Sequence, residues 1–343
     1  MEKSEVPQEE PCKDDEFQKL LLTLPEERNW DGTSLYLYQG FWCPSIAIKP
    51  VFSFQQHFQA LGSDLILAST PKSGTTWLKA LTFSILNRTR YTLKDSPLHT
   101  TSPHGLVPFV EFDVYLKNKS PNLMLLPSPR IFATHVPYGS LPSSIKESNC
   151  RIVYVCRNAV DQLISYWHFA LKLRRGNVKP LSLDEGFEKF CHGVHSFGPF
   201  AEHVLGYWKA NLDRPKNVLF LKYEDMKEDV FSHTKRLAEF LGCPFSAMEE
   251  EQGVIQEICG LCSFENLKDL EVNKSGKRPS GVPNSAFFRN GKVGDWGDHL
   301  SPSKAEYLEK LIEEKLSGSG LTLKICPKFQ KEDECKPSSE MEA

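Results

Sequence analysis

The sequence predicts an α/β protein whose single domain has a central, mainly parallel sheet flanked by helices. Short apolar runs typical of buried strands alternate with apolar patterns of helical period. One of these strands leads through a tight polar turn straight into a helix, at residues 64–81. The chain has 343 residues, 40% of them hydrophobic, so it is long enough to bury a large core.

The ends of the chain differ from its middle in composition. Residues 1–15 and 331–343 are charged and poor in apolar side chains, which predicts disordered tails. No linker interrupts the sequence between them, and we therefore expect one domain over residues 16–330.

The strand, turn and helix of residues 64–81 predict a phosphate-binding loop. Amides at the start of such a helix have no internal partner, and Lys72 adds a positive charge beside three hydroxyls. These hydroxyls belong to Ser73, Thr75 and Thr76. The loop lacks the Gly-x4-Gly-Lys-Ser/Thr pattern that holds a triphosphate, since its only glycine, Gly74, follows the lysine. The alternative is an ordinary serine or threonine helix cap.

Arg157 is a second candidate phosphate ligand. It ends the apolar run 151–156 and precedes a helical pattern, so we expect it at the carboxyl end of a buried strand. Ligands of open α/β sheets bind at that edge, and a guanidinium suits a phosphate. A surface arginine is the alternative. Two separate phosphate sites would indicate a nucleotide that is phosphorylated at two distant positions.

Four segments carry a resemblance to a known family. Residues 70–79, 132–137, 154–158 together with Ser165, and 288–296 resemble the four signature blocks of the cytosolic sulfotransferases. They occur in the family's order and spacing, and the resemblance covers the chain from about Trp42 to about Leu323. These segments are most similar to those of the plant branch of the family, the flavonol-sulfotransferase-like enzymes.

The resemblance implies a donor, 3′-phosphoadenosine 5′-phosphosulfate (PAPS), whose sulfuryl group passes to a hydroxyl of a small molecule. Its 5′-phosphosulfate would be held by Lys72, Ser73, Gly74, Thr75 and Thr76, with Trp77 stacked on the adenine. Two blocks together would hold the 3′-phosphate. The third block would contribute Arg157 and Ser165, and the final block Arg289, Asn290 and Gly291. Tyr223 matches a tyrosine that contacts the adenine.

His135 is the predicted catalytic base. It follows the apolar run 131–133, which places it at a strand end, and an imidazole with a pKa of ~6.5 accepts a proton near neutral pH. The chain has ten histidines, so a structural, hydrogen-bonded role is the alternative for any one of them. Lys72 would stabilise the charge that develops on the bridging oxygen as 3′,5′-bisphosphoadenosine (PAP) leaves.

The sequence departs from the family pattern at several positions. Asn290 stands where the family usually has a lysine, which removes a cation near the 3′-phosphate and predicts weaker donor binding. Gly297 and Leu300 replace a lysine and a phenylalanine of many members. Ala133 replaces a lysine that animal enzymes have two residues before the histidine, so an additional cation near the reacting atoms is in question.

Charge and cysteine content limit the other functions. A net charge of −3, without a basic block, predicts no binding to nucleic acid. No apolar stretch is long enough to span a bilayer, and neither a signal-peptide pattern nor a lipidation motif is present, so we expect a cytoplasmic protein without a membrane partner. The ten cysteines should be reduced, and Cys259 and Cys262 form a lone CxxC without the second pair that zinc requires. We therefore predict no metal.

The acceptor is constrained less than the donor. Aromatic side chains near the signature blocks could line an apolar cleft for a hydroxylated ligand, although ordinary core packing is the alternative for each. These are Phe109, Phe112, Tyr115, Tyr138, Tyr166, Phe287 and Phe288. The resemblance allows flavonoids and other phenolics, hydroxylated hormones and desulfo-glucosinolates, and it leaves the oligomeric state open.

Two helices outside the signature blocks can be bounded from the sequence. Ser182 and Glu185 form a capping-box pattern before an apolar stripe. Ser301 and a following proline predict the start of a last helix, and Gly318 predicts its end.

Two other functions remain as alternatives. An ATP-dependent small-molecule kinase would need magnesium and a triphosphate loop. A non-catalytic nucleotide-binding relative would be consistent with Asn290 and Gly297, whereas intact Lys72 and His135 argue against it.

Overall fold

The computed structural model describes residues 12–173, 179–278 and 280–324. Within them, four strands form a parallel sheet in the order β5-β4-β6-β7, and three strands form a small antiparallel sheet. The strands are β1 Glu26–Arg28, β2 Ser34–Tyr38, β3 Phe41–Pro44, β4 Leu65–Ser69, β5 Ile131–Thr134, β6 Arg151–Cys156 and β7 Val218–Lys222. The predicted α/β class with a central parallel sheet is confirmed. The small sheet was not predicted. Its first strand, β1, is exposed, and no apolar run marks this strand in the sequence.

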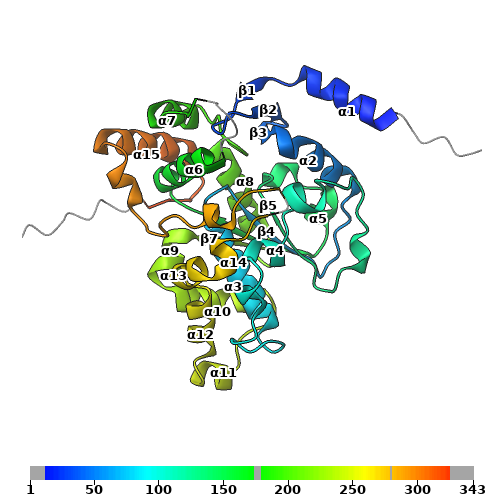
Figure 1. Cartoon of the computed structure of the whole chain (residues 1–343), viewed down its shortest axis with the longest axis vertical. Coiled ribbons are helices and arrows are strands. Elements are labelled where there is room, and N and C mark those ends of the chain that lie inside the picture. Colours follow the sequence, from blue (N-terminus) through cyan, green and yellow to red (C-terminus); the bar gives the residue numbers. More distant parts are fainter. Residues whose placement is uncertain (1–11, 174–178, 279, 325–343) are drawn as a thin grey trace, which may run out of the picture.

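Helices cover both faces of the parallel sheet. Figure 1 shows α6, α7 and α15 grouped on one side of the molecule, and α3, α10 and α12 grouped on another. The helices are α1 Cys12–Thr23, α2 Ser45–His57, α3 Thr75–Asn87, α4 Pro103–Leu106, α5 Ser143–Glu147, α6 Ala159–Leu173, α7 Leu183–Cys191, α8 Phe200–Asp213, α9 Tyr223–Glu228, α10 Val230–Phe240, α11 Ala247–Glu251, α12 Val254–Leu261, α13 Phe264–Asp269, α14 Glu271–Lys274 and α15 Pro302–Leu316.

Two hydrophobic clusters lie on the two faces of the sheet. Successive residues of a strand point to opposite faces, so Ile66 of β4 enters one cluster and Leu67 the other. Tyr154 and Val155 of β6 separate in the same way. All five residues of β4 are buried. This double burial explains why the parallel strands appear in the sequence as uninterrupted apolar runs.

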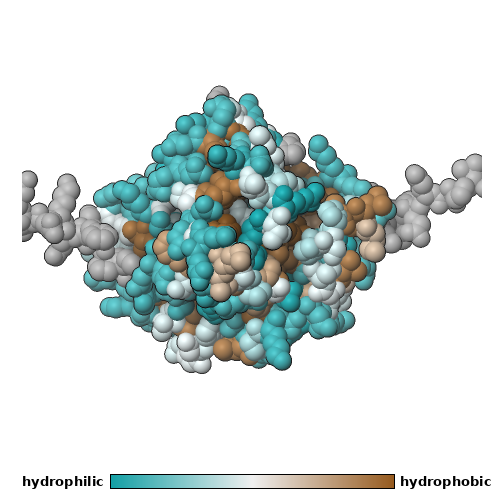
Figure 2. Space-filling model, turned by 90° about the horizontal axis from the view of Figure 1, so that it is seen from below, coloured by the Kyte–Doolittle hydropathy of each residue, from teal (hydrophilic) through white to brown (hydrophobic). Residues whose placement is uncertain are grey.

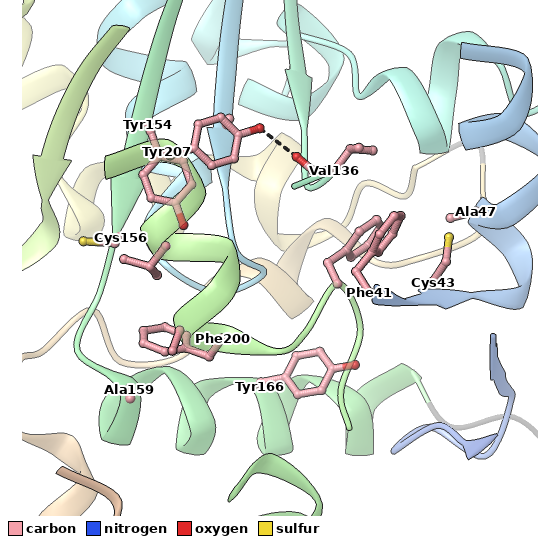
Figure 3. Packing of buried hydrophobic residues seen from close by; sticks show 14 of the residues in the cluster. Phe41, Cys43, Ala47, Val136, Tyr154, Cys156, Ala159, Tyr166, Phe200 and Tyr207 are labelled. Atoms are coloured by element: carbon pink, nitrogen blue, oxygen red, sulfur yellow. Dashed lines mark hydrogen bonds between the residues drawn. The ribbon is translucent and has the colours of Figure 1, made fainter. Parts of the chain in front are cut away.

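The close packing between β6 and α8 supports the end of β5. The ring of Tyr154 stacks on that of Tyr207, with 4.2 Å between centroids and 11° between planes. The Tyr207 hydroxyl donates a hydrogen bond of 2.7 Å to the carbonyl of Val136 (Figure 3). The core thereby holds the main chain directly after His135.

The parallel arrangement gathers the predicted site residues at one edge. All four strands point the same way, so their carboxyl ends lie together. The loop 70–74 follows β4, His135 follows β5, Arg157 follows β6, and Tyr223 follows β7. Strand order therefore brings together residues that are about 150 positions apart in the sequence.

The predicted helix boundaries are confirmed where the structure describes them. Ser182 and Glu185 form a complete capping box at the start of α7. Ser301 caps α15, which ends at Leu316, shortly before Gly318.

The first helix shortens the predicted amino-terminal tail. Because α1 begins at Cys12, residues 12–15 are helical, and the prediction of a tail over residues 1–15 is wrong for these four. Residues 1–11 and the predicted tail 331–343 lie outside the described part of the chain.

One face of the molecule is mainly hydrophilic (Figure 2). The face in Figure 2 is covered mainly by hydrophilic residues, and its hydrophobic residues occur in small groups. None of the described helices combines the length and apolar character needed to cross a bilayer.

Candidate active site

The loop between β4 and α3 leaves a helix terminus open. Gly74 is the residue that caps α3; it has a φ of 104°, and no side chain caps the first turn. A Cβ at this position would lie 2.7 Å from the ring of Tyr223, so both backbone conformation and space require glycine. The alternative of a serine or threonine cap is therefore wrong. The free amides and the helix dipole favour an anion at this terminus.

Lys72 stands in the same loop with an uncommon backbone conformation, a φ of 70°. Its Nζ lies 4.4 Å from the ring centroid of Phe169 and 5.7 Å from that of Phe287. Burial lowers the pKa of Lys72 to about 7, and the positive charge of Arg289 adds to the effect. Since no carboxylate pairs with Lys72 in the described part of the chain, its charge is available to a bound anion.

The ring of His135 has one basic nitrogen. Its Nδ1 lies 2.7 Å from the main-chain oxygen of Ser69, which only accepts, so Nδ1 carries the hydrogen and Nε2 is left as the acceptor. Burial lowers the pKa of His135 to about 3, which keeps the imidazole neutral at neutral pH. The rings of Phe109 and Phe197 have their centroids 4.7 and 5.5 Å from that of His135.

Buried polar groups fix the position of His135. Its main-chain N–H donates to Oε1 of Glu111 over 2.7 Å, and its carbonyl accepts from Nε2 of His203 over 2.9 Å. The Ser69 hydroxyl lies 2.6 Å from that of Thr75, so the base is also connected to the first residue of α3. Burial raises the pKa of Glu111 to about 7. These bonds orient the ring relative to the phosphate loop.

Two arginines form a second cationic centre. Arg157 pairs with Asp161 at 3.2 Å, and Arg289 pairs with Asp295. The Nε of each arginine is buried and has no hydrogen-bond partner within the residues described. Unpartnered buried donors are costly, and a bound phosphate would satisfy both. Ser165 lines the same cavity as the two arginines.

The final signature block is held by these aspartates. Asp161 accepts from the main-chain N–H groups of Gly294 and Trp296, at 2.9 and 3.1 Å. The side-chain amide of Asn290 donates to Asp295. The residue that replaces the family's lysine therefore supports the carboxylate that pairs with Arg289.

Aromatic rings and a glycine shape the space next to the arginines. The rings of Trp77 and Tyr223 meet edge to face with 5.6 Å between centroids, and the Tyr223 hydroxyl donates to the carbonyl of Gly291 over 3.1 Å. The guanidinium of Arg157 lies 4.9 Å above the ring of Tyr223. Gly291 has a φ of 69°, and a Cβ there would lie 2.5 Å from the ring of Phe264. The glycine is therefore required for close packing.

One cavity of about 920 Å³ contains nearly all the predicted site residues. The exception is Ser73, which is fully buried, with its hydroxyl 2.6 Å from that of Thr70. Its side chain therefore faces the protein, and only its main chain is left to bind a ligand. The predicted residues that line the cavity are Lys72, Gly74, Thr75, Thr76, Trp77, His135, Arg157, Ser165, Tyr223, Arg289, Asn290 and Gly291.

Lys79 is a buried lysine that the sequence analysis did not assign to the site. Its Nζ lies 3.1 Å from Nδ1 of His104 and 3.3 Å from the ring centroid of Phe109, and burial lowers its pKa well below the usual value. His104 in turn contacts the Thr76 hydroxyl over 3.0 Å. The sequence signal that could have indicated this residue is a lysine within the apolar stripe of the helix α3. Lys79 thus adds a buried amine beside His104 and Phe109.

The cysteine pair is part of the packing around the cavity. The thiols of Cys259 and Cys262 lie 3.3 and 3.4 Å from the hydroxyls of Thr234 and Ser84. Burial raises the pKa of both thiols. In the described residues, no group of three His, Cys, Asp or Glu side chains is arranged to hold a metal ion.

Comparisons with known proteins agree with this geometry. The sulfotransferase domain family matches residues 62–320. The chain belongs to the sulfotransferase family. It is similar to cytosolic sulfotransferase 15 of Arabidopsis thaliana, with 51% identity over 314 residues, covering 90% of this chain and 88% of that protein.

Solved structures support the same assignment. This sulfotransferase is similar to an Arabidopsis thaliana sulphotransferase with a TM-score of 0.72 and 38% identity, over 93% of this chain and 100% of the other. It is also similar to mouse sulfotransferase SULT7A1 complexed with PAP, with a TM-score of 0.64 and 26% identity, over 83% and 95% of the two chains. The recognition of the cytosolic sulfotransferases is confirmed, and with it the enzyme class, a PAPS-dependent sulfotransferase.

The aromatic lining of the acceptor side of this sulfotransferase differs in part from the prediction. Five of the seven candidate aromatic residues line the cavity, whereas Tyr115 packs against Phe54 and Tyr138 against Tyr207, so the prediction is wrong for these two tyrosines. Phe169 and Phe197 line it without having been predicted. The five confirmed residues are Phe109, Phe112, Tyr166, Phe287 and Phe288.

Proposed function

We propose that this protein transfers the sulfuryl group of PAPS to a hydroxyl of a small molecule by in-line displacement, with His135 as the general base. The observation that carries the proposal is the neutral ring of His135, whose Nδ1 is committed to Ser69 while Nε2 is left free. This ring lines the same cavity as Lys72 and the open terminus of α3.

The donor would lie across the two cationic centres. The amides of α3 and Lys72 would bind the 5′-phosphosulfate, and the unpartnered donors of Arg157 and Arg289 would bind the 3′-phosphate. Trp77 and Tyr223 would contact the adenine. The donor fits this site because a phosphate would accept hydrogen bonds from the buried N–H groups of the two arginines. These cations would supply the countercharge that magnesium supplies in phosphoryl transfer.

His135 would take the acceptor's proton at Nε2 while the acceptor oxygen bonds to sulfur. Its pKa of about 3 in the free protein makes it a weak base. The negative charge of a bound donor favours the protonated ring, so donor binding would raise this pKa toward the value that a general base needs. Ser69 would keep the ring oriented during the transfer.

Lys72 would stabilise the leaving group. Its pKa of about 7 means that it is only partly protonated in the free protein at neutral pH. A bound phosphosulfate would raise that pKa, so that Lys72 is charged when the bond between sulfur and the bridging oxygen breaks. The products would be PAP and a sulfated acceptor.

The acceptor would be a small hydroxylated molecule with an apolar body. Phe109, Phe112 and Phe197 surround His135 at ring-centroid distances of 4.7, 6.3 and 5.5 Å, which favours an aromatic or aliphatic ligand. Flavonoids and other phenolics, hydroxylated hormones and desulfo-glucosinolates all meet this requirement. Two Arabidopsis thaliana relatives that are 51% and 50% identical to this chain are named cytosolic sulfotransferases, and we propose a cytoplasmic location.

Donor binding tests the proposal. The thermal shift of the purified protein should be larger with PAP than with AMP or with ATP and magnesium, because a ligand that binds only the folded state stabilises it. Sulfation assays with PAPS and a panel of phenols and hydroxylated aliphatic compounds then test turnover. A larger shift with ATP and magnesium would favour a kinase, and a PAP shift without any turnover would favour a non-catalytic relative.

A further inference from the structure

Arg278 lies at the acceptor end of the cavity and has no role in the proposed function. It follows α14, and its main chain bonds to Val282 and Gly281, with N···O distances of 2.8 Å in both cases. The residue is 9% exposed, and it lines the cavity together with His135. A buried arginine in an otherwise apolar site requires partners for its N–H groups.

Only part of the Arg278 guanidinium is satisfied. Both carboxylate oxygens of Asp113 lie 2.5 Å from the same nitrogen, Nη2, and one of them also accepts from the main-chain N–H of Phe109. Nη1 is buried and has no hydrogen-bond partner among the described residues. A bidentate pair would use two nitrogens of the fork, whereas this one uses a single nitrogen. An acceptor oxygen is therefore missing at Nη1.

The same pattern marks the arginines at the donor end. Arg157 and Arg289 each pair with an aspartate and each keep a buried N–H without a partner. At those two residues, the missing acceptor corresponds to the 3′-phosphate of the donor. Arg278 repeats the arrangement at the opposite end of the cavity, where the donor has no phosphate to offer.

The position of Arg278 fits a group attached to the acceptor. Its Cζ lies 5.6 Å from the ring centroid of Phe109 and 5.8 Å from that of Phe287. The ring of Phe109 also contacts His135, with 4.7 Å between centroids. One small molecule could therefore present a hydroxyl to His135 and a second polar group to Arg278.

We propose that Arg278 binds a carboxylate of the acceptor, so that the preferred substrates are hydroxy-substituted carboxylic acids with an apolar body. This inference rests on the proposed function. Asp113, Lys79, His104 and His135 are the other ionisable groups near Arg278, and Asp113 alone pairs with it. The carboxylate would accept a hydrogen bond from Nη1 of Arg278. The apolar body would pack on the phenylalanines, and the hydroxyl would face Nε2 of His135.

Paired ligands test the inference. Hydroxyphenylpropanoate and ω-hydroxydodecanoate would each be compared with its methyl ester, by calorimetric binding to the protein saturated with PAP and by sulfation with PAPS. At least one acid should bind about tenfold or more tightly than its ester, and kcat/KM should favour that acid through KM. The inference is overturned if both esters bind and react as well as their acids.

Variants then assign the preference to the arginine. Arg278→Gln alone would leave Asp113 unpaired, so the informative variant is Arg278→Gln with Asp113→Asn, which removes both charges with little change in shape. The acid should lose its advantage, so that acid and ester react with the same kcat/KM, and Arg278→Lys should keep part of that advantage. Equal losses for acid and ester would indicate a structural role and contradict the inference.

The proposed function and the role of Arg278 can be disproved separately. The PAP thermal shift and turnover of any hydroxylated compound test the proposed function, whereas the ratio between acid and ester tests Arg278. If the double variant does not fold, the wild-type ratio and Arg278→Lys still decide the outcome.

Discussion

The two ends of the cavity are built differently. At the proposed donor end, main-chain amides and strand ends form the site, as the loop before α3 and the position of Arg157 show. At the acceptor end, side chains from distant segments surround His135, including Phe109, Phe197 and Arg278. The donor end is thus defined by backbone geometry, which tolerates few substitutions, and the acceptor end by side chains, which can be exchanged one at a time.

This difference separates a rigid end of the cavity from an end whose side chains can be exchanged. Gly74 and Gly291 each leave no room for a Cβ, so the donor end has little freedom to change. The acceptor end consists mainly of phenylalanines, whose replacement alters shape without breaking hydrogen bonds. The predictions below probe the two ends separately.

The largest effect is expected for His135→Ala, at the junction of the two ends. Removing a general base lowers turnover by about 10²–10⁴-fold, because the acceptor's proton then has no positioned acceptor. Steady-state sulfation assays measure this loss, and PAP binding should stay within a few-fold. The exposed His99→Ala is the matched control. Unchanged turnover in His135→Ala would rule out the proposed base.

Gly74→Ala should damage the donor end alone. The substitution forces a residue with a Cβ into a φ of 104° and against the Tyr223 ring, a strain of about 1–3 kcal/mol. If the loop must relax to bind the anion, PAP binding should weaken by about 5–150-fold. Calorimetric titration with PAP measures it. Gly40→Ala is the control, because Gly40 has a φ of 83° with open space around it. Similar PAP affinities in both variants would show that the contact with Tyr223 is unimportant.

PAP affinity should depend on pH through Lys72. The pKa of Lys72 in the free protein is lowered to about 7, and a bound anion raises it, so the contribution of Lys72 to binding is complete below pH 7. As pH rises above 7, affinity should fall by up to about tenfold per pH unit, until the pKa of the complex is reached. Binding titrations between pH 6 and 9 measure the slope. Lys72→Arg should remove this decline, and a decline that persists in it would point to another group.

Asp161→Asn should have the smallest effect of the four. Asp161 accepts from Gly294 and Trp296 and pairs with Arg157, and loss of its charge should weaken these bonds by about 1 kcal/mol. We expect PAP binding to weaken by about 3–10-fold, with the acid-to-ester ratio of acceptors unchanged. Asp184→Asn, at an exposed aspartate of α7, is the control. A change in acceptor preference would show that the two ends are coupled.

Much of the donor end could be predicted from local patterns. The apolar runs of β4, β5 and β6 marked buried strands, and the residues directly after them were assigned to the site because parallel strands end at one edge. The resemblance to the family added Arg289 and Tyr223, which no periodicity marks. Ser73 shows the limit of this reasoning, because its hydroxyl faces Thr70 rather than the cavity.

The acceptor end could not be predicted in the same way. Tyr115 and Tyr138 were candidates because they are aromatic and close to the motifs in sequence, yet both pack elsewhere. Arg278 and Phe197 lie in loops without periodicity, so no sequence pattern indicates that they reach His135. Proximity along the chain is a poor guide where loops supply the side chains.

Hydrophobic periodicity, turn chemistry and strand-end positions were enough to predict the α/β class and a phosphate-binding loop, because these depend on interactions between neighbouring residues. The prediction of His135 as the base also required the resemblance to the family. The protonation states of Lys72 and His135, the unpartnered donors of three arginines and the aromatic lining come from the folded chain alone. Burial and contacts between distant segments create these properties, since pKa values and unsatisfied N–H groups depend on what surrounds a group in space.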